Sequence, residues 1–211
     1  MSAARRIELL VRARTLGAVV IEDDYDGEFL FNPHPQDALH ALDCDERVFY
    51  VGTFSKSLFP ALRKGFLVAP PWAREALIDV KRSTDSHCDG QTQVALAAFI
   101  AEGHLARHIR RMRPIYAQRR QALVRGMEQH LGQWLQVLPG DAGLHLSARI
   151  LNGSSSAAVQ QAALDHLPGA LPLSAYAVAK SRMHGLCIGY GCVEVDQIAR
   201  AVRGIGRALD A

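Results

Sequence analysis

Apolar residues in the first part of the chain predict one helix followed by three short strands. Their helical spacing over residues 4–15 predicts the helix, which Gly17 would end. The β-branched run at 18–22 predicts a buried strand, and short apolar runs predict two more at 48–52 and 65–69. We expect these three strands to form a thin parallel sheet, which needs cover on both faces.

The rest of the chain alternates between the two patterns. Helices are predicted over residues 73–82, 91–102, 105–131, 157–166 and 195–209, and strands over 135–138, 144–151 and 185–190. The longest of these helices contains Pro114, where we expect a kink. The order of elements predicts an α/β core first and a smaller α+β unit last. We place the boundary at Pro114, between residues 1–114 and 115–211.

Composition excludes several classes of protein. The chain has 211 residues, of which 49% are hydrophobic and 21% charged, as in a soluble globular protein. Its longest apolar runs fall far short of the ~20 residues that a membrane-spanning helix needs. The net charge of +3 is too small by itself to indicate nucleic-acid binding. Four cysteines without a CxxC pair favour free thiols, and therefore a cytoplasmic protein.

An arginine-rich stretch lies in the longest predicted helix. Between Gly103 and Met127 there is no acidic residue, and the arginines are Arg107, Arg110, Arg111, Arg113, Arg119, Arg120 and Arg125. A phosphate-binding patch would need these side chains on one face, together with a geometry that reads a groove. We therefore interpret the stretch as the solvated face of a helix.

Two polar segments follow predicted strands. Residues 20–29 (VIEDDYDGEF) bring acids and a tyrosine to the end of the first strand, and residues 52–65 (GTFSKSLFPALRKG) bring a lysine among hydroxyl groups to the end of the second. In open α/β sheets, ligands bind outside the carboxyl ends of the strands. The sequence therefore predicts a ligand site at this edge of the sheet.

Lys56 is the candidate reactive group of this site. A lysine between two serines after a buried strand can form a Schiff base with an aldehyde cofactor. Pyridoxal 5'-phosphate would also need a carboxylate at its ring nitrogen, a donor at its phenolic oxygen, and cationic or hydroxyl groups at its phosphate. The residues that supply these types of group are Asp23, Tyr25, Thr53, Ser55 and Arg63.

Three stretches resemble the aminotransferase-like domain of MocR-type transcription regulators. They are IEDDYDGEF, GTFSKSLFPALRKGFLV and QVALAAFIAEGHLARHIRRMRPIYAQRRQAL. These bacterial proteins of the GntR superfamily join a winged-helix DNA-binding domain to a fold-type I, pyridoxal-phosphate-binding domain. The resemblance implies that residues 1–114 are the second half of a large cofactor-binding α/β domain. Residues 115–211 would then be the small α+β C-terminal domain.

The resemblance also implies a role for each candidate residue. Lys56 would form the internal aldimine, Asp23 would pair with the pyridine nitrogen, and Tyr25 would face the phenolic oxygen. Arg63 would contact the phosphate, assisted by Thr53 or Ser55. Asp24 is the less favoured carboxylate, because the family pattern uses the first aspartate of the pair. The family further implies a homodimer and an amino-acid or amine ligand.

The sequence departs from the family in two respects. The winged helix and the first half of the cofactor domain are absent, so we expect the chain to be a fragment that contacts DNA only through a domain it lacks. Cys187 stands where aminotransferases carry the arginine that binds the substrate carboxylate, and cysteine cannot make that bidentate ion pair. Arg182 is a weak substitute nearby. This departure favours sensing over catalysis.

Three hypotheses follow. The leading one is an effector domain that senses an amino compound by forming an external aldimine, which shifts its conformation. The second is an aminotransferase in which Lys56 moves a proton while an amino group passes from an amino acid to a 2-oxo acid. The third is a truncated remnant that binds no cofactor.

Overall fold

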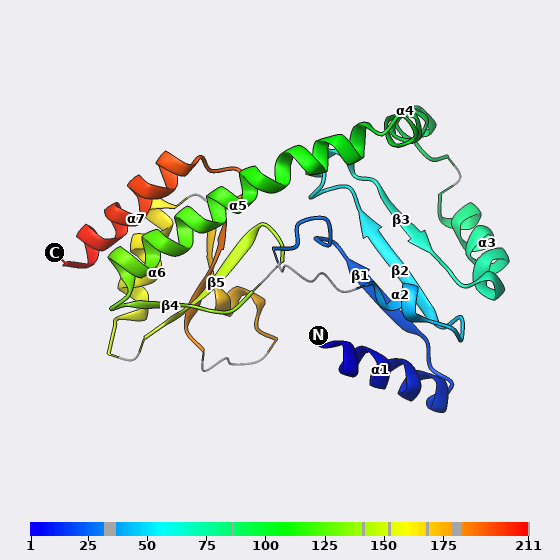
Figure 1. Ribbon diagram of the computed structural model, residues 1–211, viewed down its shortest axis with the longest axis horizontal. Helices are drawn as coiled ribbons and strands as arrows, with labels where there is room; N and C mark the ends of the chain where they lie inside the picture. Colours follow the sequence, from blue (N-terminus) through cyan, green and yellow to red (C-terminus); the bar gives the residue numbers. More distant parts are fainter. Residues whose placement is uncertain are drawn as a thin grey trace. The chain divides into compact units, whose positions relative to one another are not determined.

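The computed structural model describes residues 1–31, 37–85, 87–140, 142–151, 153–167, 169–178 and 183–210 (Figure 1). The chain divides into two compact units. Unit 1 comprises Met1–Glu28 and Asn32–Ile109, and unit 2 comprises Phe29–Phe31 and Arg110–Ala211. The units divide inside one helix, a few residues before Pro114, where we predicted the domain boundary.

Unit 1 is built on a three-stranded sheet in the order β1-β2-β3. Its strands are β1 (Val20–Asp24), β2 (Val48–Thr53) and β3 (Gly65–Val68). β1 and β2 are parallel, but β3 is antiparallel to β2, so the prediction of an all-parallel sheet was wrong. The cause is the short connection at residues 54–64, which contains only the 3-10 turn η1 (Pro60–Leu62). A parallel return needs a crossover of a dozen or more residues.

The longer helices of unit 1 agree with the predicted positions. The helices of this unit are α1 (Ala3–Leu16), α2 (Leu39–Leu42), α3 (Arg74–Thr84), preceded by the 3-10 turn η2 (Pro71–Ala73), and α4 (Gly90–Ala101). The Ser2 hydroxyl caps α1 by accepting from the backbone N–H of Arg5, and Gly17 ends the helix with a left-handed backbone (φ 64°). α2 is a single turn, and it lies in the stretch 32–46, whose prolines and polar residues predict a loop with one helical turn.

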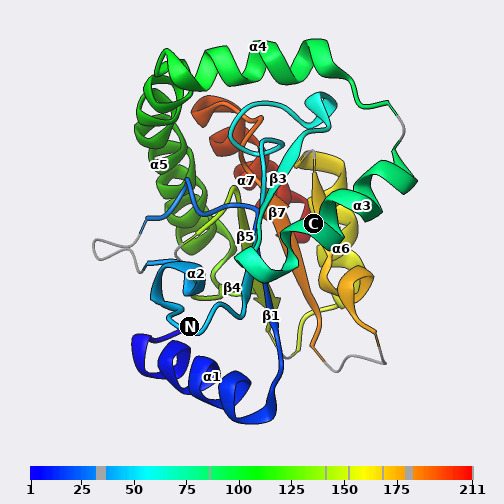
Figure 2. The same ribbon diagram turned by 90° about the vertical axis from the view of Figure 1, so that its right-hand side faces the viewer.

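Unit 2 packs helices on one face of a four-stranded antiparallel sheet in the order β4-β5-β7-β6. The strands are β4 (Leu135–Val137), β5 (His145–Ile150), β6 (Ala170–Pro172) and β7 (Gly185–Gly189). The helices are α5 (His104–Leu131, from Arg110 onward in this unit), α6 (Ser156–His166), α7 (Val195–Asp210) and the 3-10 turn η3 (Leu173–Tyr176). α6 and α7 lie side by side (Figures 1 and 2). Alternate residues of β5 and β7 join the apolar sides of these helices in the core.

One arginine of α5 departs from the predicted solvated face. Only 8% of Arg119 is exposed. Its guanidinium donates to the backbone oxygen of Gly191 and pairs with the carboxylate of Glu194, and it lies 5.8 Å from the ring centroid of Tyr116. Arg119 therefore ties α5 to the turn between β7 and α7.

Two general expectations can be compared with the structure. The four cysteines are free thiols. Among the helices of the described residues, none combines the length and the apolar character that crossing a membrane requires.

Candidate functional site

The two polar segments meet at one edge of the unit 1 sheet. β1 and β2 are parallel, with Asp23 opposite Val51 and Asp24 opposite Gly52, so their carboxyl ends lie together. Tyr25 directly follows β1, and Thr53 is the last residue of β2. The predicted meeting of the two segments at one sheet edge is confirmed.

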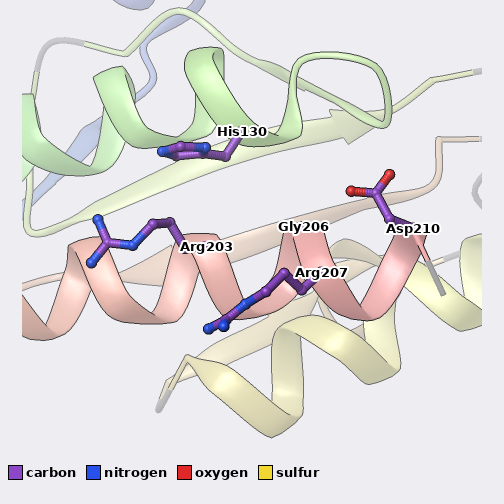
Figure 3. A pocket seen from close by; sticks show the side chains of 5 residues that line it. All are labelled: His130, Arg203, Gly206, Arg207 and Asp210. Carbon is purple, nitrogen blue, oxygen red and sulfur yellow. The ribbon is translucent and has the colours of Figure 1, made fainter.

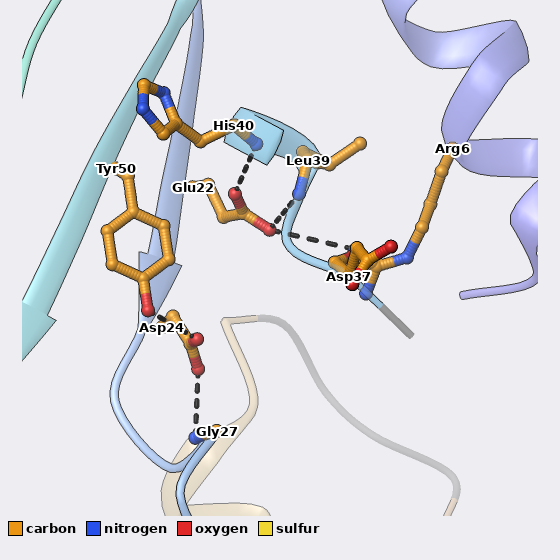
Figure 4. A network of polar contacts seen from close by, with 8 residues as sticks. All are labelled: Arg6, Glu22, Asp24, Gly27, Asp37, Leu39, His40 and Tyr50. Atoms are coloured by element: carbon orange, nitrogen blue, oxygen red, sulfur yellow. Dashed lines mark hydrogen bonds and ion pairs between the residues drawn. The ribbon is translucent and has the colours of Figure 1, made fainter. Parts of the chain in front are cut away.

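The two adjacent aspartates face opposite sides of the sheet, because side chains alternate along a strand. The carboxylate of Asp24 accepts hydrogen bonds from the Tyr50 hydroxyl (2.7 Å) and from the backbone N–H of Gly27 (2.9 Å), as Figure 4 shows. Asp23 is exposed, and within the described residues its carboxylate makes no hydrogen bond or ion pair. Of the pair, Asp24 is thus engaged by the fold, whereas Asp23 is available to a ligand.

Tyr50 is a residue of this site that sequence reasoning missed. Its pKa is raised by partial burial and by its hydrogen bond to Asp24, so the hydroxyl remains a donor throughout the physiological pH range. The sequence carries no signal for this contact, because it depends on the register that pairs Glu22 with Tyr50 and Asp24 with Gly52. Nothing in either strand by itself specifies that register.

A second acidic side chain of the motif also serves the fold. The carboxylate of Glu22 accepts hydrogen bonds from the backbone N–H groups of Leu39 (2.8 Å) and His40 (2.9 Å), at the start of α2. The guanidinium of Arg6, on α1, lies 3.8 Å from the same carboxylate (Figure 4). Glu22 thereby holds two helices of unit 1 to β1.

Lys56 lies in the turn that follows β2. The turn is organised by the Thr53 hydroxyl, which accepts from the backbone N–H of Ser55 (3.2 Å) and donates to the Ser55 hydroxyl (3.0 Å). Lys56 is exposed, and within the described residues its ammonium has no ion-pair partner. Ser57, the next residue, is only 1% exposed and so anchors the turn.

Glu28 lies against this anchor. Its carboxyl group is next to Ser57, and its pKa is raised by burial and by the negative charges of Asp24 and Asp26. The Lys56 turn, after β2, and the residues after Tyr25 are therefore in contact through Glu28 and Ser57. Sequence reasoning did not assign a role to either residue.

Arg63 adopts an uncommon backbone conformation. Its φ of 50° lies in the left-handed region, which residues other than glycine rarely occupy and which is often found at functional sites. Arg63 lines a cavity of about 560 Å³. Two lysines of that cavity have acidic partners, since Lys64 pairs with Asp89 (3.3 Å) and Lys81 with Asp85. Within the described residues the guanidinium of Arg63 has no such partner, so it can bind an anion.

The glycine of the second motif is required by packing. Gly52 is buried beneath the ring of Phe66, and a Cβ at this position would lie 2.3 Å from Phe66 Cζ. Phe66 in turn packs near Tyr50 and Phe54, with ring centroids 6.0 and 5.4 Å away. The face of the sheet that carries Asp24 is thus packed, whereas Ile21, on the face of Asp23, is 71% exposed.

Cys187 lies on β7 in unit 2, opposite Ser147 and Leu171 of the neighbouring strands. Its side chain is half-buried and lies next to Tyr176. Arg182, the weak substitute for the arginine that Cys187 replaces, lies outside the described residues.

A separate hollow of about 310 Å³ lies near the ends of α5 and α7 (Figure 3). The residues that line it are His130, Arg203, Gly206, Arg207 and Asp210. Basic side chains near the carboxyl ends of helices are favourable because they complement the helix dipole. This basic cluster therefore has a structural explanation, and it contains none of the predicted site residues.

The chain matches a family of aminotransferases, and its relatives include transcription regulators. The family described as aminotransferase class I and II matches residues 6–171. The chain is 36% identical over 208 residues to the HTH-type transcriptional regulator YhdI of Bacillus subtilis, with 99% of this chain and 44% of the regulator covered. It is 35% identical over 204 residues to the probable rhizopine catabolism regulatory protein MocR of Rhizobium meliloti, with coverage of 97% and 41%.

Solved structures with the same fold include aminotransferases. The kynurenine aminotransferase of Pyrococcus horikoshii, in complex with PMP, matches with a TM-score of 0.87 and 26% identity over 100% of this chain and 52% of its own. LysN, the α-aminoadipate aminotransferase of Thermus thermophilus, complexed with N-(5'-phosphopyridoxyl)-L-leucine, matches with a TM-score of 0.83 and 26% identity over 99% and 54%. The chain thus spans less than half the length of the two regulators and about half that of the two enzymes.

Proposed function

Because the chain belongs to the family of class I and II aminotransferases, we propose that it is the pyridoxal-phosphate-binding part of a MocR-type regulator, in which the cofactor senses an amino compound. One observation carries the proposal. Asp23, Lys56 and Arg63, on β1 and on the segment after β2, have no acidic or basic partner within the described residues. The other charged groups of both motifs are engaged by the fold.

The chemistry of these groups fits pyridoxal 5'-phosphate. When bound, the cofactor supplies an aldehyde carbon that condenses with an amine with loss of water, and a ring that withdraws electrons. Lys56 Nζ would be that amine, and Asp23 would keep the ring nitrogen protonated. Tyr25 would donate to the phenolic oxygen. The guanidinium of Arg63 and the hydroxyls of Thr53 and Ser55 would hold the phosphate.

The side chain at position 187 favours sensing over turnover. An arginine binds a carboxylate through two parallel charge-assisted hydrogen bonds, and Cys187 offers none of that geometry. With the cofactor held by these residues, the amine of such a compound would take the place of Lys56 Nζ, and the released Lys56 amine would change the charge at the end of β2. We propose that this exchange is the signal. In the regulator, DNA binding would be done by a winged-helix domain, and a homodimer would assemble the site.

An aminotransferase is the second candidate, because the solved structures that match the fold include enzymes of that class. The two functions make different predictions for a mixture of an amino donor and a 2-oxo acid. A sensor exchanges its amine once and then stops, whereas an enzyme accumulates new amino acid over many turnovers.

Titration of the full chain with pyridoxal 5'-phosphate tests the proposal. We expect visible absorption, and reduction with borohydride should attach the cofactor at Lys56, as located by peptide mass spectrometry. Lys56→Ala should abolish both signals, and Lys64→Ala, in the same segment but paired with Asp89, should retain both. A chain that never absorbs in the visible would support the third hypothesis, a truncated remnant that binds no cofactor. Multiple turnovers would support the enzyme.

A further inference from the structure

Positive charge is concentrated in unit 2. With neutral histidines, unit 2 has 12 lysines and arginines against 6 acidic residues, a net charge of +6. Unit 1 has 12 against 15, a net charge of −3. The modest charge of the whole chain is therefore the sum of two units of opposite sign. An asymmetry of this kind indicates that the basic unit meets an anionic partner.

α5 and α7 carry nine of the twelve basic residues of unit 2, and they pack side by side. A Cβ at Gly126, on α5, would lie 3.4 Å from Val202 Cγ1, and one at Gly206, on α7, would lie 3.2 Å from the backbone oxygen of His130. The two contacts are four residues apart on both helices. The helices therefore run in the same direction, with their exposed sides next to each other.

Four arginines on the exposed sides of these helices form what we call the basic face. They are Arg111 and Arg125 on α5 and Arg203 and Arg207 on α7, and all four are exposed. In the part of the chain that the structure describes, none of the four side chains forms an ion pair or a hydrogen bond. Arg111, Gln118 and Arg125 recur every seven residues, so they form a polar stripe that extends about 21 Å along α5.

The fold leaves the charge of the basic face unbalanced. Arg203 and Arg207 are four residues apart on α7, so their like charges repel (Figure 3). Arg200, on the same helix, instead pairs with Asp196 at 2.7 Å. The helix dipole offsets part of the repulsion near the end of α7, but it does not reach the two arginines of α5. A bound polyanion would balance all four charges.

The surroundings of the basic face favour a nucleic-acid duplex over other polyanions. A helix that binds a membrane surface exposes an apolar side, but α5 and α7 bury theirs in the core of unit 2. Single-stranded nucleic acid stacks its bases on exposed aromatic rings. The two helices have one aromatic residue, Tyr116, which is half-buried against Phe29. The exposed side chains of Gln118 and Gln121 can donate to phosphate oxygens.

We propose that the basic face binds the phosphate backbone of double-stranded DNA. The choice of DNA rests on the proposed function, because relatives of the chain are named as regulators, whereas the charge argument stands without it. Contacts with phosphates fix position but read no bases. Unit 2 would therefore add affinity for DNA of any sequence, and sequence would be read by the winged-helix domain of the regulator.

Fluorescence anisotropy of a labelled duplex of mixed sequence, mixed with the full chain over a range of salt concentrations, tests the proposal. Neutralisation of four phosphates predicts that log Kd rises with the logarithm of the salt concentration with a slope of about 3–4. Two triple variants carry the same change of charge on exposed helices. One combines Arg125→Gln, Arg203→Gln and Arg207→Gln on the basic face, and the other combines Arg5→Gln, Arg12→Gln and Arg14→Gln on α1.

The basic-face variant should lower the slope by about 2–3 and weaken binding at least about tenfold at about 50 mM salt, because each lost arginine leaves one phosphate unneutralised. The α1 variant should bind within about threefold of the unmodified chain. Lysine at the same three positions of the basic face should preserve the slope, since lysine also binds phosphate as a point charge. Preservation by lysine separates the role of charge from any loss of folding, which circular dichroism also measures.

Equal weakening in both glutamine variants would show that binding follows net charge alone, and it would overturn the proposal. Unchanged binding in both variants, or no salt-dependent binding of the duplex, would also overturn it. Stronger binding to vesicles of phosphatidylserine and phosphatidylcholine than to the duplex would assign the basic face to a membrane instead.

Cofactor uptake is measured separately, by visible absorption. A chain that binds the duplex through the basic face but never takes up pyridoxal 5'-phosphate would reject the cofactor part of the proposed function and retain this inference. A chain that takes up the cofactor without binding the duplex would do the opposite.

Discussion

Replacing each of the two adjacent aspartates by alanine should have opposite consequences. Asp24→Ala removes a carboxylate that accepts two hydrogen bonds, at 2.7 and 2.9 Å. Hydrogen bonds to charged groups contribute about 1.5–3 kcal/mol each, and water can partly replace them at this half-buried position, so we expect a loss of about 2–4 kcal/mol. Asp23→Ala removes an exposed carboxylate without a partner in the described residues and should change the free energy of unfolding by less than about 0.5 kcal/mol.

Cofactor binding should show the reverse order. A charge-assisted hydrogen bond from the ring nitrogen to Asp23 is worth about 1.5–3 kcal/mol, so Asp23→Ala should weaken binding of pyridoxal 5'-phosphate about 10- to 100-fold. Asp24→Ala should bind within about threefold of the unmodified chain under conditions where it is folded. Urea unfolding followed by circular dichroism measures the first effect, and titration of visible absorption measures the second. If Asp23→Ala destabilises the chain and Asp24→Ala abolishes the absorption, the assignment is reversed and our reasoning from strand alternation fails.

Three further substitutions test the scaffold, each by the free energy of unfolding. Arg119→Met should destabilise the chain by about 1–3 kcal/mol, because it removes a buried guanidinium that binds the turn after β7. Arg125→Met, at an exposed position, should cost less than about 0.5 kcal/mol. Equal losses in the two variants would refute the role of Arg119. Tyr190→Phe should destabilise the chain by about 1–2 kcal/mol, because the buried hydroxyl donates to the backbone oxygen of Gly143 at 2.6 Å. Tyr176→Phe, at an exposed position, should leave the free energy of unfolding unchanged. An unchanged free energy in Tyr190→Phe would show that this hydrogen bond contributes nothing to stability. Burial raises the pKa of Asp43, but hydrogen bonds from three backbone N–H groups outweigh burial, so the pKa is lowered on balance. The Asp43 carboxylate therefore stabilises the fold fully above the ordinary pKa of aspartate, and this stabilisation is lost as the pH falls through the lower folded value. Asp43→Asn should therefore destabilise at neutral pH and converge with the unmodified chain in acid, and a constant difference across pH would contradict this.

The sequence predicted most of the elements because their signals are local. The helical spacing before Gly17 and the β-branched run of β1 each lie within one segment, and both elements are confirmed. β6 was missed because three residues, one of them a proline, carry no readable period. The parallel sheet was wrong because β3 has the apolar character of a buried strand, and only the length of its connection reveals its direction.

The candidate site was harder to predict because its supporting contacts join segments far apart in the chain. Glu22 meets backbone amides that lie 17 and 18 residues later, and Asp24 meets a tyrosine 26 residues later. Arg119 finds its partners more than 70 residues away. Residue types and strand ends identify candidate ligand-binding groups, but only the register of neighbouring strands reveals which acidic side chains form hydrogen bonds within the protein.

The alternation of side chains along β1 explains why some acids of this motif stabilise unit 1 while another faces a possible ligand. Consecutive acids on a strand cannot share a face, so Glu22 and Asp24 lie on the side where α2 and Tyr50 offer hydrogen-bond donors. Asp23 lies on the other side, where the neighbouring Ile21 is largely exposed. A single-residue slip of β1 would exchange the two faces, so that Glu22 and Asp24 would lose these donors and Asp23 would move to the packed side of the sheet. The contacts that stabilise unit 1 are therefore the same contacts that determine which carboxylate a ligand can reach.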